Sequence, residues 1–451
     1  MMRLANGSAR PFILPIIAFA LAIFAGALLL LLPAFRNAEV SWIDALFISV
    51  SAFCVTGLAP FDVFEVFNIG GQTVVLVLMQ LGGIGIISLT TLAGLLINNR
   101  VAFSERIALE QGISYDPRHS LKGFLLRVVA IVFLVEAAGA ILLWLFFDGQ
   151  QRLFNSVFLS VSAFCNAGFA PWGDSLEQFR TNYAMNIVIM ALIVLGGLGF
   201  YVLDELYRKA GSLLSTRRAP PLSFYSRLVL GVTCWLVLGG AAILFLLGCL
   251  NPGFASFSLG DRICSAFFES VTCRTAGFAT INQASLSSAA LLLVIFLMFI
   301  GGSPGSCAGG IKTTTFRILA AFLLANFRGR NQAIARQRAF GEATVQKALL
   351  LLAFGLHIIF AASFLILLLE QGASPHEHSK PFFDIFFEVV SAFCTVGLSI
   401  NLPSGLSDAS KLVLCILMFV GKLGPIWLLA AVQCFQAPVS FRYPDENIPV
   451  G

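Results

Sequence analysis

The sequence predicts an all-α integral membrane protein with eight transmembrane helices and four re-entrant pore helices, arranged as four tandem helix, pore loop, helix units in a pseudo-fourfold arrangement. Three observations predict this fold class. The 451 residues are 58% hydrophobic and 11% charged, against roughly 25% charged in an average soluble domain. Apolar runs of roughly 20 residues, long enough to cross a bilayer core as helices, recur along the chain. One glycine motif occurs four times, which predicts units at residues 1–100, 101–210, 211–335 and 336–451.

Each unit begins with a long apolar run, which predicts its first membrane-spanning helix. The runs are Pro11 to Leu32, Leu125 to Phe147, Leu228 to Leu250 and Ala348 to Leu369. The first run follows Arg3 and Arg10 but is too long for the core of a signal peptide, so we expect it to be retained.

A segment of 10 to 14 residues rich in Phe and Ser follows each run. These segments are Trp42 to Phe53, Leu153 to Phe164, Ile263 to Thr272 and Phe383 to Phe393. Helices this short cannot cross a bilayer, so they are predicted to re-enter. Irregular backbone at membrane depth is tolerated where it is buried or lines water, so the four segments are expected to line one pore.

A glycine motif ends each short segment, and a second long run follows it. The predicted filter residues are Val55, Thr56, Gly57 and Leu58; Asn166, Ala167, Gly168 and Phe169; Thr275, Ala276, Gly277 and Phe278; and Thr395, Val396, Gly397 and Leu398. Three copies follow a Ser-Ala-Phe-Cys sequence, whereas the third follows Ser270-Val-Thr-Cys-Arg274. A further glycine comes 24 to 28 residues later in every unit, at Gly82, Gly196, Gly301 and Gly421.

Glycine at these positions suits a ring of backbone carbonyls, which can replace the water around a dehydrated cation. Aiming successive carbonyls at one axis requires positive φ, which glycine adopts at little steric cost. The motifs contain no carboxylate, which argues against a pore for divalent cations. Asp62, Glu65, Asp174 and Glu177 follow the first two motifs; they either concentrate cations at the entrance or are ordinary solvated loop charges.

The basic residues predict the orientation of the chain. Nineteen Lys and Arg lie on the side away from the pore loops and six on the loop side, so both termini are expected to be cytoplasmic. The net charge of +5 therefore follows topology, and no nucleic-acid partner is predicted.

Glycines interrupt the second long run of the third unit, between Gly301 and Gly310. Such a stretch should be irregular and shielded from lipid, beneath the filter, where it can obstruct the conduit. The residues concerned are Gly305, Ser306, Cys307, Ala308, Gly309, Gly310 and Lys312. A phosphate-binding loop is not predicted, because Ile311 separates the glycines from Lys312.

The four motifs and the stretch Gly301 to Thr314 resemble the Trk/Ktr/HKT superfamily of K⁺ uptake proteins, and the chain is most similar to the KtrB type. The resemblance implies a K⁺-channel-like pore with Gly57, Gly168, Gly277 and Gly397 in its filter, and K⁺, with Na⁺ as a second candidate, as the ion. It also implies an intramembrane gating loop at the third-unit glycines, a homodimer in the bacterial inner membrane, and a cytosolic nucleotide-binding regulatory subunit.

Arg274, Lys312 and Lys422 lie at membrane depth, and these charges call for partners. Arg274 is expected to pair with Glu269 or Glu388 and to brace the third filter loop. Lys422 stands where the family usually has Arg, and Cys307 where it usually has Ser or Thr. These two departures put the family's contact between that basic residue and the gating loop in doubt.

An ion-coupled secondary symporter of K⁺ with Na⁺ or H⁺ is the alternative. Its repeats would usually be inverted, whereas these re-enter from one side, and only Glu136, Asp204 and Glu205 are placed for a proton relay. An enzyme is not expected, because the four histidines form no metal-binding or catalytic motif.

Overall fold

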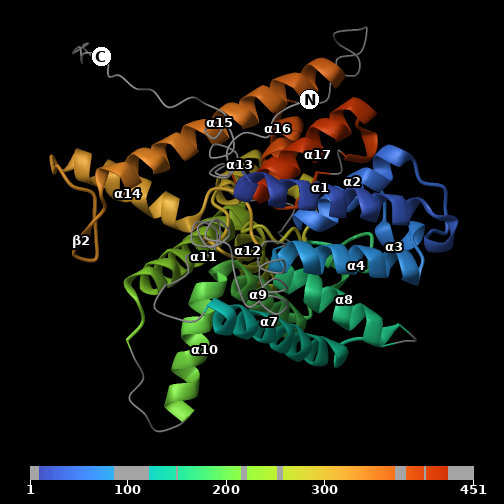
Figure 1. Cartoon of the computed structure of the whole chain (residues 1–451), viewed down its shortest axis with the longest axis horizontal. Coiled ribbons are helices and arrows are strands. Elements are labelled where there is room, and N and C mark those ends of the chain that lie inside the picture. The colour runs from blue at the N-terminus through green and yellow to red at the C-terminus, as the bar shows by residue number, and fades with distance from the viewer. Residues whose placement is uncertain are drawn as a thin grey trace.

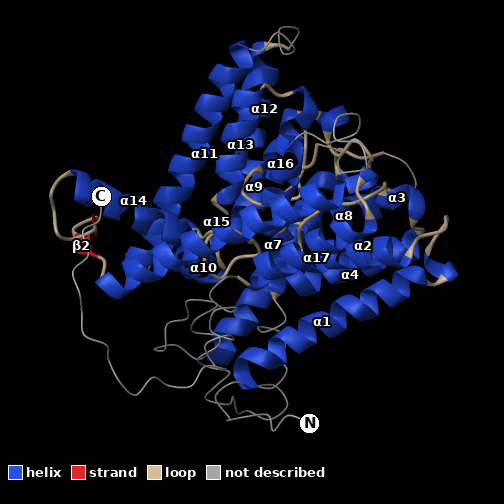
Figure 2. Ribbon diagram, turned by 90° about the horizontal axis from the view of Figure 1, so that it is seen from above, coloured by secondary structure: helices blue, strands red, loops and turns tan. Residues whose placement is uncertain are grey.

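The computed structural model describes residues 10–85, 121–148, 151–214, 221–250, 257–370, 382–400 and 403–424, without the side chains of 10–15 and 213–214. Apart from one short pair of strands, the regular structure in these ranges is helical (Figure 2). Residues 86–120, which include Arg100, Arg106 and Arg118, and both chain ends lie outside the described residues.

The helices of the first two units follow the predicted order. They are α1 (Arg10–Leu31), a 3-10 turn (Pro33–Phe35), α2 (Trp42–Cys54), α3 (Val63–Val66) and α4 (Ile69–Ile84), then α7 (Leu121–Trp144), α8 (Arg152–Cys165), a 3-10 turn (Glu177–Phe179), α9 (Tyr183–Leu198) and α10 (Phe200–Leu214).

The last two units repeat this order. They contain α11 (Phe224–Leu250), α12 (Leu259–Thr272), a 3-10 turn (Gln283–Ser285), α13 (Ser288–Phe299) and α14 (Thr313–Phe327), the strands β1 (Ile334–Ala335) and β2 (Arg338–Ala339), then α15 (Glu342–Glu370), α16 (Phe382–Phe393), a 3-10 turn (Pro403–Gly405) and α17 (Asp408–Leu423). The strands pair antiparallel, with Ile334 opposite Ala339.

The four predicted short segments are helices of 12 to 14 residues: α2, α8, α12 and α16. Three helices in the described part of the chain, α7, α11 and α15, are long and apolar enough to cross a membrane, and the bent pair α9 and α10 provides a fourth span if it is counted as one. The predicted total of eight transmembrane helices stays a prediction.

The helices form a closed ring of four groups. In each group the short helix packs between a first and a second helix, as α8 does with α7 and α9. The second helix of each group then packs on the short helix of the next: α4 on α8, α9 on α12, α13 on α16, and α17 back on α2. Figure 1 shows the result, with red α17 beside blue α2. The ring therefore places four short helices around one centre.

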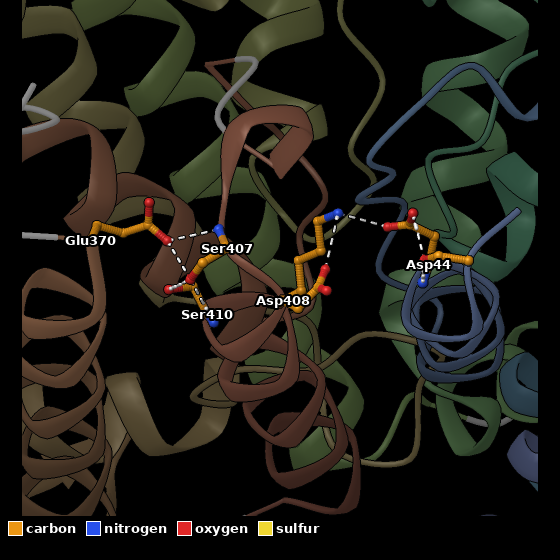
Figure 3. A network of polar contacts seen from close by, with 7 residues as sticks. Asp44, Glu370, Ser407, Asp408 and Ser410 are labelled. Carbon is orange, nitrogen blue, oxygen red and sulfur yellow. Dashed lines mark hydrogen bonds and ion pairs between the residues drawn. The ribbon is translucent and has the colours of Figure 1, made fainter. Parts of the chain in front are cut away.

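A partly buried ion pair joins the last unit to the first. The Lys411 ammonium at the start of α17 lies 2.7 Å from the Asp44 carboxylate in the first turn of α2, and 3.9 Å from Asp408. Figure 3 shows Asp44 and Asp408 on either side of this contact. The Ser407 hydroxyl and backbone N–H both donate to Glu370 of α15 at 2.8 Å, which fixes the start of α17. The pair thus closes the ring at the junction of its two ends.

The second helix is broken in the second unit as well as in the third, although the sequence predicted a break only in the third unit. In the second unit α9 and α10 meet at 110°, at Gly199 with φ of +93°. The sequence there is continuously apolar, so its periodicity gives no sign of the bend. A glycine in this conformation ends a helix because an L side chain would be strained.

Candidate ion-conducting site

The four predicted filter glycines meet in a closed ring. A Cβ added at Gly57 would lie 3.0 Å from the Cα of Gly168, and the same construction gives 3.1 Å from Gly168 to Gly277, 3.1 Å from Gly277 to Gly397 and 3.2 Å from Gly397 to Gly57. Each such Cβ would also overlap the carbonyl oxygen of the residue before the next glycine: Ala167, Ala276, Val396 and Thr56 in turn. The centre is therefore lined by backbone and has no room for side chains.

The backbone of each loop alternates in handedness. φ is positive at the second residue before each glycine, at Val55, Asn166, Thr275 and Thr395, and again at each glycine, with values from +51° to +95°. An L-residue in this region costs about 1–2 kcal/mol. Such strain persists where the surroundings hold the chain in place.

Hydroxyl groups at the ends of the short helices hold these loops. Ser162 donates to the carbonyl oxygen of Phe169, and Ser391 to that of Leu398, both at 2.7 Å. Gly57 N–H donates to the Ser51 hydroxyl at 3.1 Å. In the third unit Thr272 takes this place and donates to Phe278 at 2.7 Å.

This geometry corrects the alignment of the third motif. Ser270, which the motif places opposite the bracing serines, instead donates to Val237 of α11 at 2.9 Å. Thr272 precedes its glycine by five residues, whereas the serines precede theirs by six. The threonine was missed because the spacing differs by one.

The second set of glycines has a packing role. A Cβ at Gly82, Gly196 or Gly421 would overlap the carbonyl oxygen of Phe53, Phe164 or Phe393, respectively. Gly301 stands against Gly309 instead, because the third-unit loop occupies that position. The constant spacing seen in sequence therefore reflects close approach of each second helix to the end of its short helix.

No charged side chain belongs to the ring. The twelve filter residues other than glycine are uncharged and buried. α2 and α8 end immediately before their filter loops, so the partial negative charge of each helix C-terminus faces the ring. Backbone dipoles therefore contribute a negative potential there.

A cavity of about 440 Å³ opens on one side of the ring, with the four glycines on its wall. The carboxylates of Asp62, Asp174 and Glu177 line it, whereas Glu65 does not. Burial, with Asp174 nearby, raises the pKa of Glu177 above its ordinary value. Three of the four acidic residues that follow the first two motifs thus border this cavity.

The third-unit loop lies on the opposite side of the ring. A Cβ added at Gly309 would overlap the Thr395 hydroxyl, and one at Gly310 would lie 3.3 Å from the Cβ of Cys394. On its other flank, Ser303 N–H donates to Gly197 at 3.0 Å and Cys307 N–H to Gly196 at 3.3 Å. The loop therefore bridges the second and fourth units on the side of the glycine ring away from the cavity.

Two lysines hold this loop. The Lys312 ammonium donates to the carbonyl oxygen of Ala308 at 2.6 Å. The Lys422 ammonium, from α17, donates to that of Cys307 at 2.7 Å. The contact with the loop that the Lys422 departure put in doubt is therefore present.

The expected pairing of Arg274 with a carboxylate is wrong. Among the described residues Arg274 forms no ion pair with Glu269 or Glu388, and its Nε and Nη2 atoms have no hydrogen-bond partner. Glu269 accepts from Gln283 at 3.2 Å, and Glu388 accepts from the Ser399 hydroxyl at 2.5 Å. Both carboxylates therefore bind residues that follow a glycine motif, and neither contacts the Arg274 guanidinium.

The groups considered for a proton relay lie in separate contacts. Glu136 accepts from Gln80 at 3.0 Å. Asp204 is ion-paired with Arg127 at 2.6 Å, and Glu205 accepts from Ser223 at the start of α11. Within the described ranges no group of three or more His, Cys, Asp or Glu could hold a metal ion.

Several known proteins are similar to this chain over most of its length. A family model described as TrkH, cation transport protein, matches residues 8–438. The chain is 35% identical to the potassium/sodium uptake protein NtpJ of Enterococcus hirae and 33% identical to the Ktr system potassium uptake protein B of Bacillus subtilis, each over 96% of this chain and 95% of the relative. The crystal structure of the potassium transporter TrkH from Vibrio parahaemolyticus superposes with a TM-score of 0.75 at 19% identity, covering 96% of this chain and 86% of that one, and shows the same fold.

Proposed function

The chain belongs to the TrkH family of cation transport proteins, and on that premise we propose that it takes up K⁺ through a filter formed by its four glycine loops. It is a membrane transporter and not an enzyme. The observation that carries the proposal is the closed ring of Gly57, Gly168, Gly277 and Gly397. The names of both curated relatives support K⁺ as the ion.

The chemistry of the ring favours a monovalent cation. Carbonyl oxygens from four loops replace the hydration shell of the ion, and the filter contributes no formal charge. Divalent cations are bound more tightly by carboxylates, which these loops lack. The acidic entrance formed by Asp62, Asp174 and Glu177 raises the local K⁺ concentration.

The loop from Gly305 to Lys312 acts as the gate in this proposal. Its support is its position beside Cys394 and Thr395, on the inner side of the ring. Lys312 and Lys422 hold the loop in place through hydrogen bonds to its carbonyl oxygens. Displacing the loop would open the path below the filter.

The assembly is also part of the proposal. We infer that the chain is the translocating subunit of a Ktr-type system, as a homodimer in a bacterial cell membrane with both termini cytoplasmic and a cytosolic nucleotide-binding partner. The name of the Bacillus relative supports the Ktr system. Exposed apolar side chains such as Leu134, Trp235 and Phe364 provide surface for lipid or for a second copy.

Coupling to Na⁺ or H⁺ is the second candidate. The name of the Enterococcus relative includes sodium, which favours Na⁺ as a co-transported or alternative ion. The separate contacts of Glu136, Asp204 and Glu205 favour H⁺ coupling less.

Growth rescue tests the proposal. Cells lacking their own K⁺ uptake systems should grow at limiting K⁺ when they express this chain together with a regulatory subunit of the Ktr type. Varying K⁺ and Na⁺ separately shows which ion is required. Absence of rescue by protein that is present in the membrane would contradict K⁺ uptake.

A further inference from the structure

The third-unit loop is fastened to the bend between α9 and α10 as well as to the two lysines. Phe200 is the first residue of α10, so its backbone N–H has no partner within the helix, and it donates to the carbonyl oxygen of Gly305 at 2.8 Å. A Cβ added at Gly199 would lie only 2.7 Å from the carbonyl oxygen of Pro304. The bend therefore offers the loop a donor, and the glycine leaves room for its close approach.

The hydroxyl of Tyr225 holds the same part of the loop from another helix. Tyr225 lies in the first turn of α11, and its hydroxyl donates to the carbonyl oxygen of Pro304 at 3.2 Å. Its ring also packs edge to face on the ring of Tyr201 of α10, with 5.7 Å between the centroids. The Tyr225 side chain therefore contacts the loop and α10 at once.

Glu205 of α10 fixes the start of α11 and hence the place of Tyr225. Its carboxylate accepts from the backbone N–H of Ser223 at 2.6 Å and from the Ser223 hydroxyl at 2.9 Å. The Ser226 hydroxyl also donates to it. Hydrogen bonds to a carboxylate are roughly twice as strong as those between neutral groups. Glu205 thus clasps the turn of α11 that carries Tyr225.

An ion pair anchors α10 to the first helix of its own unit. The buried carboxylate of Asp204 lies 2.6 Å from Arg127 of α7 and 3.0 Å from Arg208, one turn further along α10. Beyond this anchor α10 extends away from the other helices (Figure 1). The part of α10 beside the loop is therefore the part that is fixed in place.

We propose that Tyr225 is a positioning residue of the gate: its hydroxyl holds the third-unit loop in place, and Glu205 acts through it by fixing the first turn of α11. The effect on transport rests on the function proposed above, whereas the hold on the loop does not. Lys422 of α17 holds the loop at Cys307, three residues beyond the carbonyl that Tyr225 holds. Displacing this part of the loop would break both contacts.

Labelling of the Cys307 thiol measures the position of the loop in the purified full-length protein. Cys307 is buried in the loop and Cys415 is buried in α17, so each should react with a maleimide only when its surroundings open. Peptide mass spectrometry gives the two rates separately. Tyr225→Phe removes the hydroxyl and keeps the ring. The loss of one neutral hydrogen bond should raise the rate at Cys307 about two- to tenfold and leave the rate at Cys415 unchanged. K⁺ flux into liposomes should rise with the Cys307 rate.

Tyr207→Phe is the matched control, because Tyr207 is an exposed tyrosine on α10. It should change neither the labelling nor the flux. Glu205→Gln should raise the Cys307 rate in the unmodified protein. It should add little to Tyr225→Phe, because two residues that act through one contact do not have additive effects.

Unchanged Cys307 labelling in Tyr225→Phe would overturn the proposal. An equal rise at Cys307 and Cys415 would do so as well, because it would indicate a general loosening of the fold. Additive effects of Glu205→Gln and Tyr225→Phe would overturn the action of Glu205 through Tyr225. Faster Cys307 labelling without a change in flux would overturn the role of Tyr225 in gating. If the unmodified protein carries no K⁺ flux, the proposed function fails, and labelling still decides the hold on the loop.

Discussion

Replacing Lys422 by methionine tests the gate directly. Methionine keeps most of the length of the side chain but removes the ammonium group, which donates to the Cys307 carbonyl oxygen at 2.7 Å. Lys422 is partly buried, which limits the access of water to this bond. The substitution should weaken the hold of α17 on the loop and raise the K⁺ flux.

The size of the effect follows from the hydrogen bond that is lost. A bond donated by a charged group contributes about 1.5–3 kcal/mol, and each 1.4 kcal/mol changes a population about tenfold. If the loop is in place most of the time, its displaced population should rise about tenfold to a hundredfold. Flux should rise in proportion until the conduit itself becomes limiting.

The assay is K⁺ flux into liposomes at matched protein content. Lys422→Arg is the control, because it retains a cationic donor that can reach the same carbonyl, and its flux should stay near that of the unmodified protein. Removing a positive charge can also raise flux by admitting more cations. Lys312→Met, alone and combined with Lys422→Met, separates release of the loop from removal of a positive charge. If both lysines hold the same loop, the effects of the two substitutions on flux should not be additive.

A flux from Lys422→Met that equals or falls below that of the unmodified protein, in a variant that elutes as a single folded species, would refute the gate. Additive effects of the two lysines would instead support simple electrostatic repulsion. In that case the loop would be a structural part of the third unit.

Three further outcomes are expected. Gly57→Ser should weaken the discrimination of K⁺ over Na⁺, because the new Cβ would overlap the Ala167 carbonyl oxygen. Gly248→Ser is the control and should leave the selectivity unchanged, because Gly248 lies in open space on α11. Equal ion selectivity in the two variants would contradict the filter. Deleting residues 305–309 should raise K⁺ flux, and lost flux with normal expression would indicate a structural kink. Because burial raises the pKa of Glu177, its carboxylate should be protonated at a higher pH than usual, so K⁺ uptake at low K⁺ should fall as the medium is acidified. Glu177→Gln should flatten that pH profile, and Glu65→Gln, outside the entrance cavity, should preserve it.

Much of the fold was predictable because local features determine it. The short helices were predicted from their length, and α2, α8, α12 and α16 lie where the Phe-rich and Ser-rich segments are. Repetition in the same way identified Gly57, Gly168, Gly277 and Gly397, which meet in one ring. The order of units around the ring depends on contacts such as α17 with α2, which no local pattern encodes.

The errors have specific physical reasons. The bend at Gly199 lies within an apolar sequence that is also compatible with one straight helix. Arg274 was expected to pair with Glu269 or Glu388 because a charge at membrane depth calls for a partner, but these carboxylates accept from Gln283 and Ser399 instead. Thr272 was missed because it braces its loop from a spacing one residue shorter than that of the serines. All three depend on side-chain direction or backbone φ, which composition and periodicity do not specify.

The reversal potential of the reconstituted protein tests the central claim most directly. Liposomes with fixed K⁺ and Na⁺ gradients are used, and each gradient is then changed alone. A K⁺-selective ring predicts that the potential follows the K⁺ gradient and is nearly insensitive to Na⁺ and pH. A potential that shifts with Na⁺ or H⁺ at constant K⁺ would contradict a channel-like filter and favour coupled transport.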